Sequence, residues 1–282
     1  MHFQLEARAL YRKAHTLGKK NIRKSVKEGT DSYLKELSSF LDESMVASKE
    51  ELGIMEIPTE NIVGVASDSA KELYASDFMP LSAPDTEFAD QWCTLYLHYL
   101  SDEGIHGVIT CYEYLGCFYV VDGKKRVSVV KSHGAPTIIA SVTRLLPSKT
   151  EEEEIQRYYD FLQNFELTKL YQISFTQHGS FAKLQTALGY DTDHVWNEMD
   201  RFSFLFNWYA FDRAFKEAFR GTLNITTADA LVVMLEDYPY SELRQMHPWI
   251  LTSIIQSAWK KLYKVANPNF VFALDQEVKK VS

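Results

Sequence analysis

The fold of this chain is decided by one stretch of its sequence, Gly107-Val-Ile-Thr-Cys-Tyr-Glu-Tyr-Leu-Gly-Cys-Phe-Tyr-Val-Val-Asp-Gly-Lys-Lys-Arg126. It contains two runs rich in β-branched and aromatic residues, Gly107 to Glu113 and Cys117 to Val121, which are typical of strands. The residues between these runs, Tyr114-Leu-Gly116, form a connection short enough for a tight turn. The pattern therefore predicts a β-hairpin.

A helix is expected directly after the hairpin. The chain turns at Asp122-Gly123, a short helix follows from Lys124 to His133, and Gly134 stands where a left-handed cap costs least. The segment Thr137 to Thr143 is again rich in β-branched residues and predicts another strand. These elements together indicate a small α/β domain.

Upstream of the hairpin, Thr86 is expected to cap an amphipathic helix from Glu87 to Leu100. A short strand is predicted from Gly53 to Pro58, and a loop-rich passage from Pro58 to Asp85 separates the two. Each of these elements adds to the same domain.

The N-terminal part of the chain has helical spacing, because apolar residues recur every three or four positions between Glu6 and Ser44. Gly29 and Thr30 are expected to divide this stretch into two helices, with Thr30 or Asp31 capping the second.

After Pro147 the pattern is helical nearly to the end of the chain. Its signals are acids in a first turn at Glu151 to Glu154, a cap at Thr226 or Thr227 before Ala228 to Leu235, and Pro248 at the start of a helix from Trp249 to Val265. The predicted fold class is therefore α+β, with an N-terminal helical arm (1–52), an α/β domain (53–147) and a C-terminal helical bundle (148–282).

Composition limits the class of protein. A chain of 282 residues that is 46% hydrophobic and 13% aromatic can bury a large core. We expect it to be soluble and cytoplasmic, with no export signal and no membrane partner, because no stretch approaches about 18 uncharged apolar residues. Three cysteines without a Cys-x-x-Cys pair, Cys93, Cys111 and Cys117, imply neither a disulfide framework nor a cysteine zinc site.

The net charge of −8 argues against an extensive surface for nucleic acids. Its distribution is uneven, since residues 1–28 hold eight Lys/Arg against two acids, whereas residues 29–60 hold two Lys against eight acids. The basic N-terminal helix would suit a polyanion such as DNA. The alternative, that this helix is solvated or packs on the acidic segment after it, stays open.

The turn at Gly123 carries the best candidate for chemistry. The first amides of a helix point outward with the positive end of its dipole, and such an end attracts anions. Lys124, Lys125 and Arg126 add three cations in the same turn, and Arg126 can grip a phosphate with two parallel hydrogen bonds. Asp122 would hold Mg²⁺ or accept a proton, although an aspartate before a glycine equally often bonds its own backbone. Three solvated cations at an ordinary turn remain the alternative.

The run Gly116-Cys-Phe-Tyr-Val-Val-Asp-Gly-Lys-Lys-Arg-Val-Ser-Val-Val-Lys-Ser-His-Gly134, followed by Ile138-Ile-Ala-Ser-Val142, resembles the second conserved box of the ParB/sulfiredoxin-like superfamily. The upstream segment from Phe88 to Val108-Ile109 resembles the preceding helix and strand of that family, so the likeness covers about residues 54 to 147. In the family a Gly-x-x-Arg turn holds nucleotide phosphates, and Gly123 and Arg126 stand at these positions. The resemblance implies a small mixed-sheet domain that binds a nucleoside triphosphate or diphosphate with Mg²⁺.

The sequence differs from the family's motif in two ways, and these differences limit which of the family's activities it can have. Sulfiredoxins have their catalytic cysteine at the position of Lys124, so sulfiredoxin activity is excluded. Partition-type ParB proteins have Gly-Glu-Arg-Arg in this turn, and the loss of that glutamate argues against their CTP hydrolysis. Bacterial relatives of unknown function with Asp-Gly-Asn-His-Arg are nearer to this sequence. Some members of the superfamily use a glutamate base, but none of Glu56, Glu60 and Glu113 falls in a matching motif.

Three functional hypotheses follow. The first is a nucleotide-binding protein, either a phosphotransferase or hydrolase or a nucleotide-gated regulator, with phosphates on Gly123, Lys124, Lys125 and Arg126 and with Asp122 as a candidate catalytic residue. The second is a DNA-associated transcriptional or partition-type regulator that uses the basic helix. The third is an interaction module whose nucleotide site has decayed.

Other motifs are weaker. Phe181 to Trp196 only faintly matches a helix-turn-helix, and its recognition helix, Asp191 to Asp200, would carry four acids and no Lys or Arg, which would repel DNA. The aromatic residues between Phe202 and Phe215 have helical spacing and predict core packing. The scattered histidines, His98, His106, His133, His178 and His194, predict no structural metal.

Overall fold

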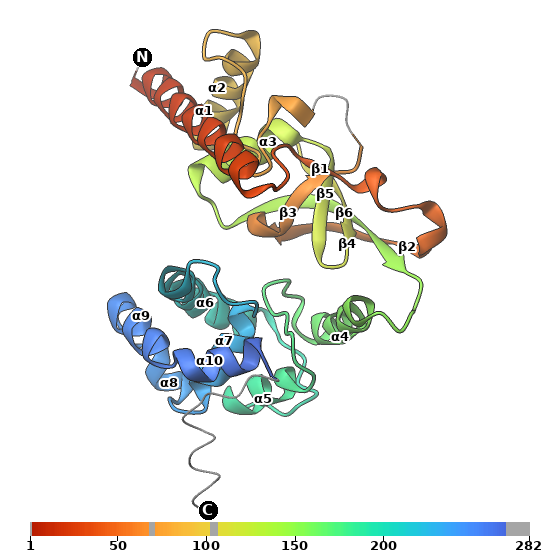
Figure 1. Cartoon of the computed structure of the whole chain (residues 1–282), viewed down its shortest axis with the longest axis vertical. Helices are drawn as coiled ribbons and strands as arrows, with labels where there is room; N and C mark the ends of the chain where they lie inside the picture. Colours follow the sequence, from red (N-terminus) through yellow and green to blue (C-terminus); the bar gives the residue numbers. More distant parts are fainter. Residues whose placement is uncertain (1, 68–70, 102–106, 269–282) are drawn as a thin grey trace, which may run out of the picture. The chain divides into compact units, whose positions relative to one another are not determined.

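The computed structural model describes residues 2–67, 71–101 and 107–268, and the chain divides into two compact units, residues 1–151 and residues 152–282 (Figure 1). The first unit contains a mixed β-sheet with helices, and the second is helical. The α+β class predicted from the sequence is therefore confirmed.

The sheet of the first unit has six strands in the order β1-β3-β5-β4-β6-β2. The pairs β1–β3, β3–β5 and β4–β6 are parallel, whereas β4–β5 and β2–β6 are antiparallel. The hairpin predicted from the sequence is the β4–β5 pair at the centre of this sheet. The strands are β1 (Lys35–Glu36), β2 (Val46–Pro58), β3 (Ile62–Val65), β4 (Ile109–Tyr114), β5 (Cys117–Asp122) and β6 (Thr137–Pro147).

Three helices, α1 (His2–Glu28), α2 (Glu87–Leu100) and α3 (Lys124–His133), pack together beside the sheet, where α3 contacts β4 and both α1 and α2 contact α3 (Figure 1). Their contacts centre on Trp92 of α2. Its ring meets Tyr11 of α1 edge to face at 5.3 Å, and its indole N–H donates to the hydroxyl of Ser128 in α3 over 2.9 Å. Because these side chains are buried, the three helices form one packed layer.

Two predicted helix ends are confirmed. The hydroxyl of Thr86 accepts a hydrogen bond from the amide of Ala89 and so caps α2. Gly134, with φ of 86°, ends α3 in the left-handed conformation, and its amide donates to the carbonyls of Lys131 and Val130. The structure therefore places α3 where the sequence predicted it.

The second helix predicted between Thr30 and Ser44 is wrong. After α1 the backbone of Lys35–Glu36 pairs with β3, and the segment continues as two single 3₁₀ turns, η1 (Leu37–Ser39) and η2 (Glu43–Met45). The apolar residues that suggested a helix instead cover a face of the sheet, where Leu37 packs with a buried cluster of Tyr114, Tyr119 and Leu145. Sheet pairing has overridden the helical period.

The strand predicted at Gly53 begins earlier, at Val46, and pairs with β6 along nearly its whole length. The pairing tolerates two irregularities in register, one between Val46 and Ser48 and one between Glu51 and Gly53. The first half of β2 is exposed at the edge of the sheet and consists mostly of polar residues. It therefore lacks the alternation of apolar and polar residues from which a strand is predicted. Downstream, the passage predicted as loop contains β3 and two further 3₁₀ turns, η3 (Thr59–Asn61) and η4 (Lys71–Leu73).

The second unit contains a long central helix, α6, and six others. The predicted helix from Trp249 to Val265 is interrupted at Ala258, which lies between two shorter helices. The other predicted signals hold, because Thr226 caps α7 and Pro248 is the first residue of α9. The helices are α4 (Glu153–Thr168), α5 (Ser180–Ala187), α6 (Glu198–Phe219), α7 (Thr227–Leu235), α8 (Tyr240–Leu243), α9 (Pro248–Ser257) and α10 (Trp259–Ala266).

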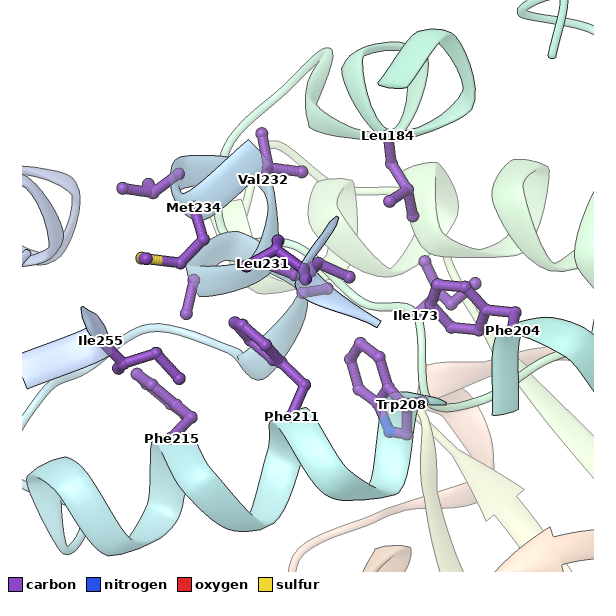
Figure 2. Packing of buried hydrophobic residues seen from close by; sticks show 14 of the residues in the cluster. Ile173, Leu184, Phe204, Trp208, Phe211, Phe215, Leu231, Val232, Met234 and Ile255 are labelled. Atoms are coloured by element: carbon purple, nitrogen blue, oxygen red, sulfur yellow. The ribbon is translucent and has the colours of Figure 1, made fainter. Parts of the chain in front are cut away.

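The core of the second unit forms around α7, whose residues Ala228–Met234 are all buried. Figure 2 shows Phe211 and Phe215 of α6 packing toward Leu231 and Met234 of this helix. A helix that is apolar all round needs partners on every side, and α5, α6 and α10 supply them.

The weak match of residues 181–196 to a helix-turn-helix does not correspond to such a motif in the structure. The residues between α5 and α6 are not helical, so no recognition helix begins at Asp191. Asn197 instead caps α6, because its side chain accepts from the amides of Met199 and Asp200 while Asp200 bonds back to the Asn197 amide. In neither unit, within the ranges given above, is a helix long and apolar enough to cross a membrane.

Candidate anion-binding site

The site begins with the turn between β5 and α3. Gly123 has φ of 104° and ψ of 21°, a conformation that only glycine adopts readily. A Cβ atom at this position would lie 2.6 Å from Cγ2 of Ile109 in β4. Both the dihedral angle and the close approach therefore require glycine, and they fix the direction in which α3 leaves the sheet.

The five residues predicted as a site line one open hollow of about 350 Å³ beside this turn. Its wall is completed by four residues from α2 and from the segment before it. The lining residues are Leu73, Tyr74, Phe88, Leu95, Asp122, Gly123, Lys124, Lys125 and Arg126. The structure therefore brings the predicted polar residues together with an apolar wall that the sequence analysis did not include.

The start of α3 has no side-chain cap and no acidic residue in its first turn. Its first intrahelical hydrogen bond runs from the amide of Val127 to the carbonyl of Gly123 over 3.1 Å. The amides of Lys124, Lys125 and Arg126 precede that bond, so they belong to the group that an α-helix leaves for outside acceptors. The positive end of the helix dipole lies here.

Arg126 is half-buried, with 26% of its side chain exposed. Its Nη1 lies 3.5 Å from Oδ2 of Asp122, whose side chain is 77% exposed. On the other side the guanidinium approaches Gly107, where an added Cβ would stand 3.1 Å from Nη2. Contacts on two sides hold the guanidinium in one place, which favours bidentate contact with a planar or tetrahedral oxyanion.

Lys125 reaches across the hollow to α2. Its ammonium donates to Oε1 of Gln91 and lies 5.0 Å from the centre of the Phe88 ring. Gln91 is itself oriented by a hydrogen bond of 2.9 Å from its amide to Glu87. Among the described residues the ammonium forms no ion pair, and its contacts with a neutral acceptor and a ring face leave its charge available to an anion.

The apolar wall is held by aromatic packing. The rings of Tyr74 and Phe88 meet edge to face with their centres 5.5 Å apart. Phe88 and Leu95 lie on the same side of α2, seven residues apart, with Gln91 between them. A ligand with a charged end and a flat apolar part would meet matching surfaces at both ends of the hollow.

The glutamates weighed in the sequence analysis lie elsewhere. Glu113 is fully buried, where Oε2 accepts from Nε of Arg144 over 2.7 Å and Oε1 accepts from the amide of Gly116 over 2.7 Å. Glu56 accepts a hydrogen bond from the hydroxyl of Thr137, and Glu60 lies in the turn η3. None of the three lines the hollow, so they give no general base there.

The aromatic run on α6 is only partly core. Phe204, Trp208, Phe211 and Phe215 are buried as predicted, but Phe202 and Phe206 are exposed. Of the histidines, His106 lies outside the described residues, and no cluster of three His, Cys, Asp or Glu side chains suited to a metal ion occurs in the part of the chain that the structure describes. Cys93, Cys111 and Cys117 are free thiols.

Sequence reasoning also missed a second hollow, of about 210 Å³, in the helical unit. Its polar wall includes Arg157 and a pair in which Nδ1 of His178 lies 2.6 Å from Oδ2 of Asp160. Arg157 and Asp160 are three residues apart on α4 and His178 follows 18 positions after Asp160, a spacing that matches no motif used in the sequence analysis. Two missed members of the first hollow, Phe88 and Leu95, lie seven residues apart on a helix that the sequence predicted, but their spacing does not indicate that they face α3.

The first hollow is therefore the better candidate, since a glycine-dependent turn, uncapped helix amides and cations from one short segment meet beside an apolar wall. A phosphate group has the charge and the acceptor number to satisfy this arrangement. Comparison with known proteins gives no family for it, because no family model and no curated protein matches this chain.

Proposed function

We propose that the first unit binds a nucleotide in the hollow at the start of α3, with phosphates on the turn from Gly123 to Arg126 and the nucleoside against Tyr74 and Phe88. One observation carries this proposal. All the polar residues of the turn line the same hollow, and the turn has a backbone conformation that only glycine adopts readily.

The electrostatics of the turn support an anionic ligand. A helix N-terminus favours acids by about 0.3 to 1 kcal/mol per charge, yet the first turn of α3 holds Lys124, Lys125 and Arg126 and no acid. The helix dipole by itself therefore disfavours cations at these three positions in the free protein. A bound phosphate would make the electrostatic interaction at this end of the helix favourable, and its oxygens would accept hydrogen bonds from the helix amides.

Each residue has a distinct role in the proposal. Arg126 grips two phosphate oxygens, because its guanidinium is fixed between Asp122 and Gly107. Lys125 exchanges its neutral acceptor on Gln91 for a phosphate oxygen. Mg²⁺ in nucleotide sites takes one or two carboxylates and otherwise phosphates and waters, and Asp122 fits as the acidic residue among the described residues that line the hollow.

The apolar wall suits a nucleobase. Stacking of a base on an aromatic side chain contributes about 1 to 3 kcal/mol, and it tolerates any base. Phe88 already has an ammonium over its ring, so displacement of Lys125 by phosphate binding would free that face. The resemblance to ParB/sulfiredoxin-like proteins supports the same positions for Gly123 and Arg126.

The geometry favours a nucleotide-gated regulator over a hydrolase or phosphotransferase. Asp122 is 77% exposed and pairs with Arg126, so its carboxylate faces the cation that would hold the phosphate. The buried Glu113 is held by Arg144, away from the hollow. Binding without turnover is the expected result, whereas an interaction module with a decayed site would bind no nucleotide at all.

The test is a thermal-shift and calorimetric titration with the four ribonucleoside triphosphates and their diphosphates, each with Mg²⁺. A nucleotide at 100 times its dissociation constant would stabilise the folded protein by about 2.7 kcal/mol. Arg126→Ala should abolish the shift, whereas Arg213→Ala, which removes an exposed arginine from α6, should retain it. A shift that is absent in the unmodified protein, or equal in both variants, rejects the proposal. Phosphate release in the same samples measures turnover.

A further inference from the structure

Helix α1 has two very different faces. Its inner face is used by the fold, because Ala7, Tyr11 and Ala14 are buried against α2 and the segment before it. The packing is close enough that a Cβ atom on Gly18 would lie 3.1 Å from Cβ of Met79. The helix is therefore rigidly attached to the first unit along much of its length.

The outer face carries a continuous basic stripe. It begins at Arg12-Lys13, continues at Lys19-Lys20 and Arg23-Lys24, and ends at Lys27, and all seven side chains are exposed. No acid occurs between Arg12 and Lys27. At 1.5 Å per residue the stripe is about 22 Å long.

The fold does not use these charges. Among the residues that the structure describes, the only ion pair from the stripe joins Lys24 to Glu28, 3.9 Å apart at the exposed end of the helix. Arg8, which precedes the stripe and turns toward the fold, shows the contrast, since it pairs with Asp90 and donates to the carbonyl of Pro84 over 3.1 Å. The stripe has no structural task of this kind.

The rest of the molecule has the opposite charge. Residues 1–28 hold eight Lys/Arg against two acids, which leaves 22 Lys/Arg against 36 Asp/Glu elsewhere in the chain. A polyanion would be repelled by the body of the protein and attracted to one face of one helix. This separation orients any such partner on α1.

We propose that the stripe on α1 docks on the sugar–phosphate backbone of a nucleic-acid duplex. A duplex presents about one negative charge per 1.7 Å of its axis, so a straight row of cations on a rigid helix meets phosphates along its whole length. A helix also fits the major groove, which is about 12 Å wide. The contact is independent of base sequence, because the stripe consists of Lys and Arg with no amide side chain on the outer face.

An acidic membrane surface is the competing partner, and the structure disfavours it. A helix that lies on a membrane inserts its apolar face between the lipids. In α1 the residues of that face, Tyr11 and Ala14 among them, are already buried by the fold. The exposed apolar residues of α1 are scattered around the helix and form no continuous apolar face; they are Phe3, Leu5, Leu17 and Val26.

The test is fluorescence anisotropy with a labelled mixed-sequence DNA duplex at several salt concentrations. The chain with Lys13→Glu, Lys20→Glu and Lys27→Glu is compared with one carrying Lys49→Glu, Lys183→Glu and Lys260→Glu, three exposed lysines outside α1. Both variants change the net charge equally. Circular dichroism and thermal unfolding then verify that both variants remain folded.

The unmodified protein should bind the duplex with an affinity that falls about 10³-fold or more between 50 and 200 mM salt. The α1 variant should lose this binding by at least 10²-fold, and its salt slope should drop by about three, one for each phosphate contact removed. The control variant should bind like the unmodified protein.

Three outcomes would overturn the inference. The first is no duplex binding at about 50 mM salt, where phosphate contacts are strong. The second is an equal loss in both triple variants, which would show that net charge and not the stripe controls binding. The third is binding of the unmodified protein to phosphatidylserine vesicles without binding to the duplex.

Discussion

Gly123 and Ile109 stand so close that a Cβ atom on the glycine would lie 2.6 Å from Cγ2 of the isoleucine. The first strand of the hairpin thereby sets where α3 starts, although the two residues belong to different elements. The turn that gathers Lys124, Lys125 and Arg126 depends on this contact, because any larger residue would push the start of α3 away from β4.

We predict that Gly123→Ala destabilises the first unit and abolishes anion binding together. The left-handed conformation alone costs an alanine about 1 to 2 kcal/mol, and the clash with Ile109 adds roughly 1 to 3 kcal/mol. The matched control is Gly134→Ala at the other end of α3, where φ is 86° and no atom lies within 4 Å of the added Cβ. Urea unfolding that gives the same loss for both variants would refute the role of Ile109.

The sequence was sufficient for the part of the fold governed by local signals. The strands β4 and β5, the turn at Gly123, the helix α3 and its cap at Gly134 all follow from residues adjacent in the chain. The polar half of the hollow follows for the same reason, since its residues are consecutive. A site whose residues belong to one short segment can be predicted without knowledge of tertiary contacts.

The segment after α1 shows why other parts of the fold could not be predicted from the sequence. Its apolar residues have helical spacing, but Lys35 pairs with Gly64, 29 positions away in the sequence. A Cβ on Gly64 would lie 2.2 Å from the carbonyl oxygen of Lys35, so the pairing exists only because β3 has a glycine there. No local pattern in residues 30–44 records this requirement. The apolar wall of the hollow was missed for a related reason, because Tyr74 and Phe88 come from segments whose approach to α3 is tertiary.

Glu113 is predicted to be structural and not catalytic. Glu113→Gln should lower the free energy of unfolding by about 3 to 5 kcal/mol, because Arg144, only 2% exposed, keeps a buried charge without its partner. Glu50→Gln removes the other, half-exposed carboxylate of the same arginine and should cost about 0 to 1 kcal/mol. Chemical denaturation measures both values. Nucleotide affinity that fell in folded Glu113→Gln protein would contradict the structural assignment.

The stability of the first unit is predicted to fall in mild acid because of His15. Burial, and then the nearby charge of Lys19, lower the pKa of His15 below its usual 6.5, and its Nε2 is buried without a hydrogen-bond partner in the described structure. The unfolded chain therefore takes up a proton at a higher pH than the folded one does. The stability that His15 contributes is complete above pH 6.5 and is lost as the pH falls through the lower, folded-state pKa.

Replacement by an aromatic residue without a titrating group isolates this effect. His15→Phe should retain the stacking on Tyr11, whose ring is nearly parallel at 12°, and should flatten the decline in stability below pH 6.5. His133→Gln, at an exposed position of α3, should leave the decline unchanged. Urea unfolding at a series of pH values compares the three proteins, and a decline as steep in His15→Phe as in the unmodified chain would rule out His15 as its source.

The helical unit is predicted to depend on one buried carboxylate. Asp229 is 2% exposed, and it accepts hydrogen bonds from the amide and hydroxyl groups of both Thr176 and Thr226. It therefore joins the segment before α5 to the start of α7, the helix around which the core forms.

Asp229→Ala leaves several buried donors without an acceptor and should cost about 2 to 4 kcal/mol, and Asp229→Asn should cost less because it keeps one acceptor oxygen. Asp237→Asn, which removes an exposed partner of Lys261, should cost about 0 to 1 kcal/mol. Tryptophan fluorescence during denaturation reports on this unit through the buried Trp196 and Trp208, and an Asp229→Ala variant as stable as Asp237→Asn would show that the four hydrogen bonds do not hold α7 in place.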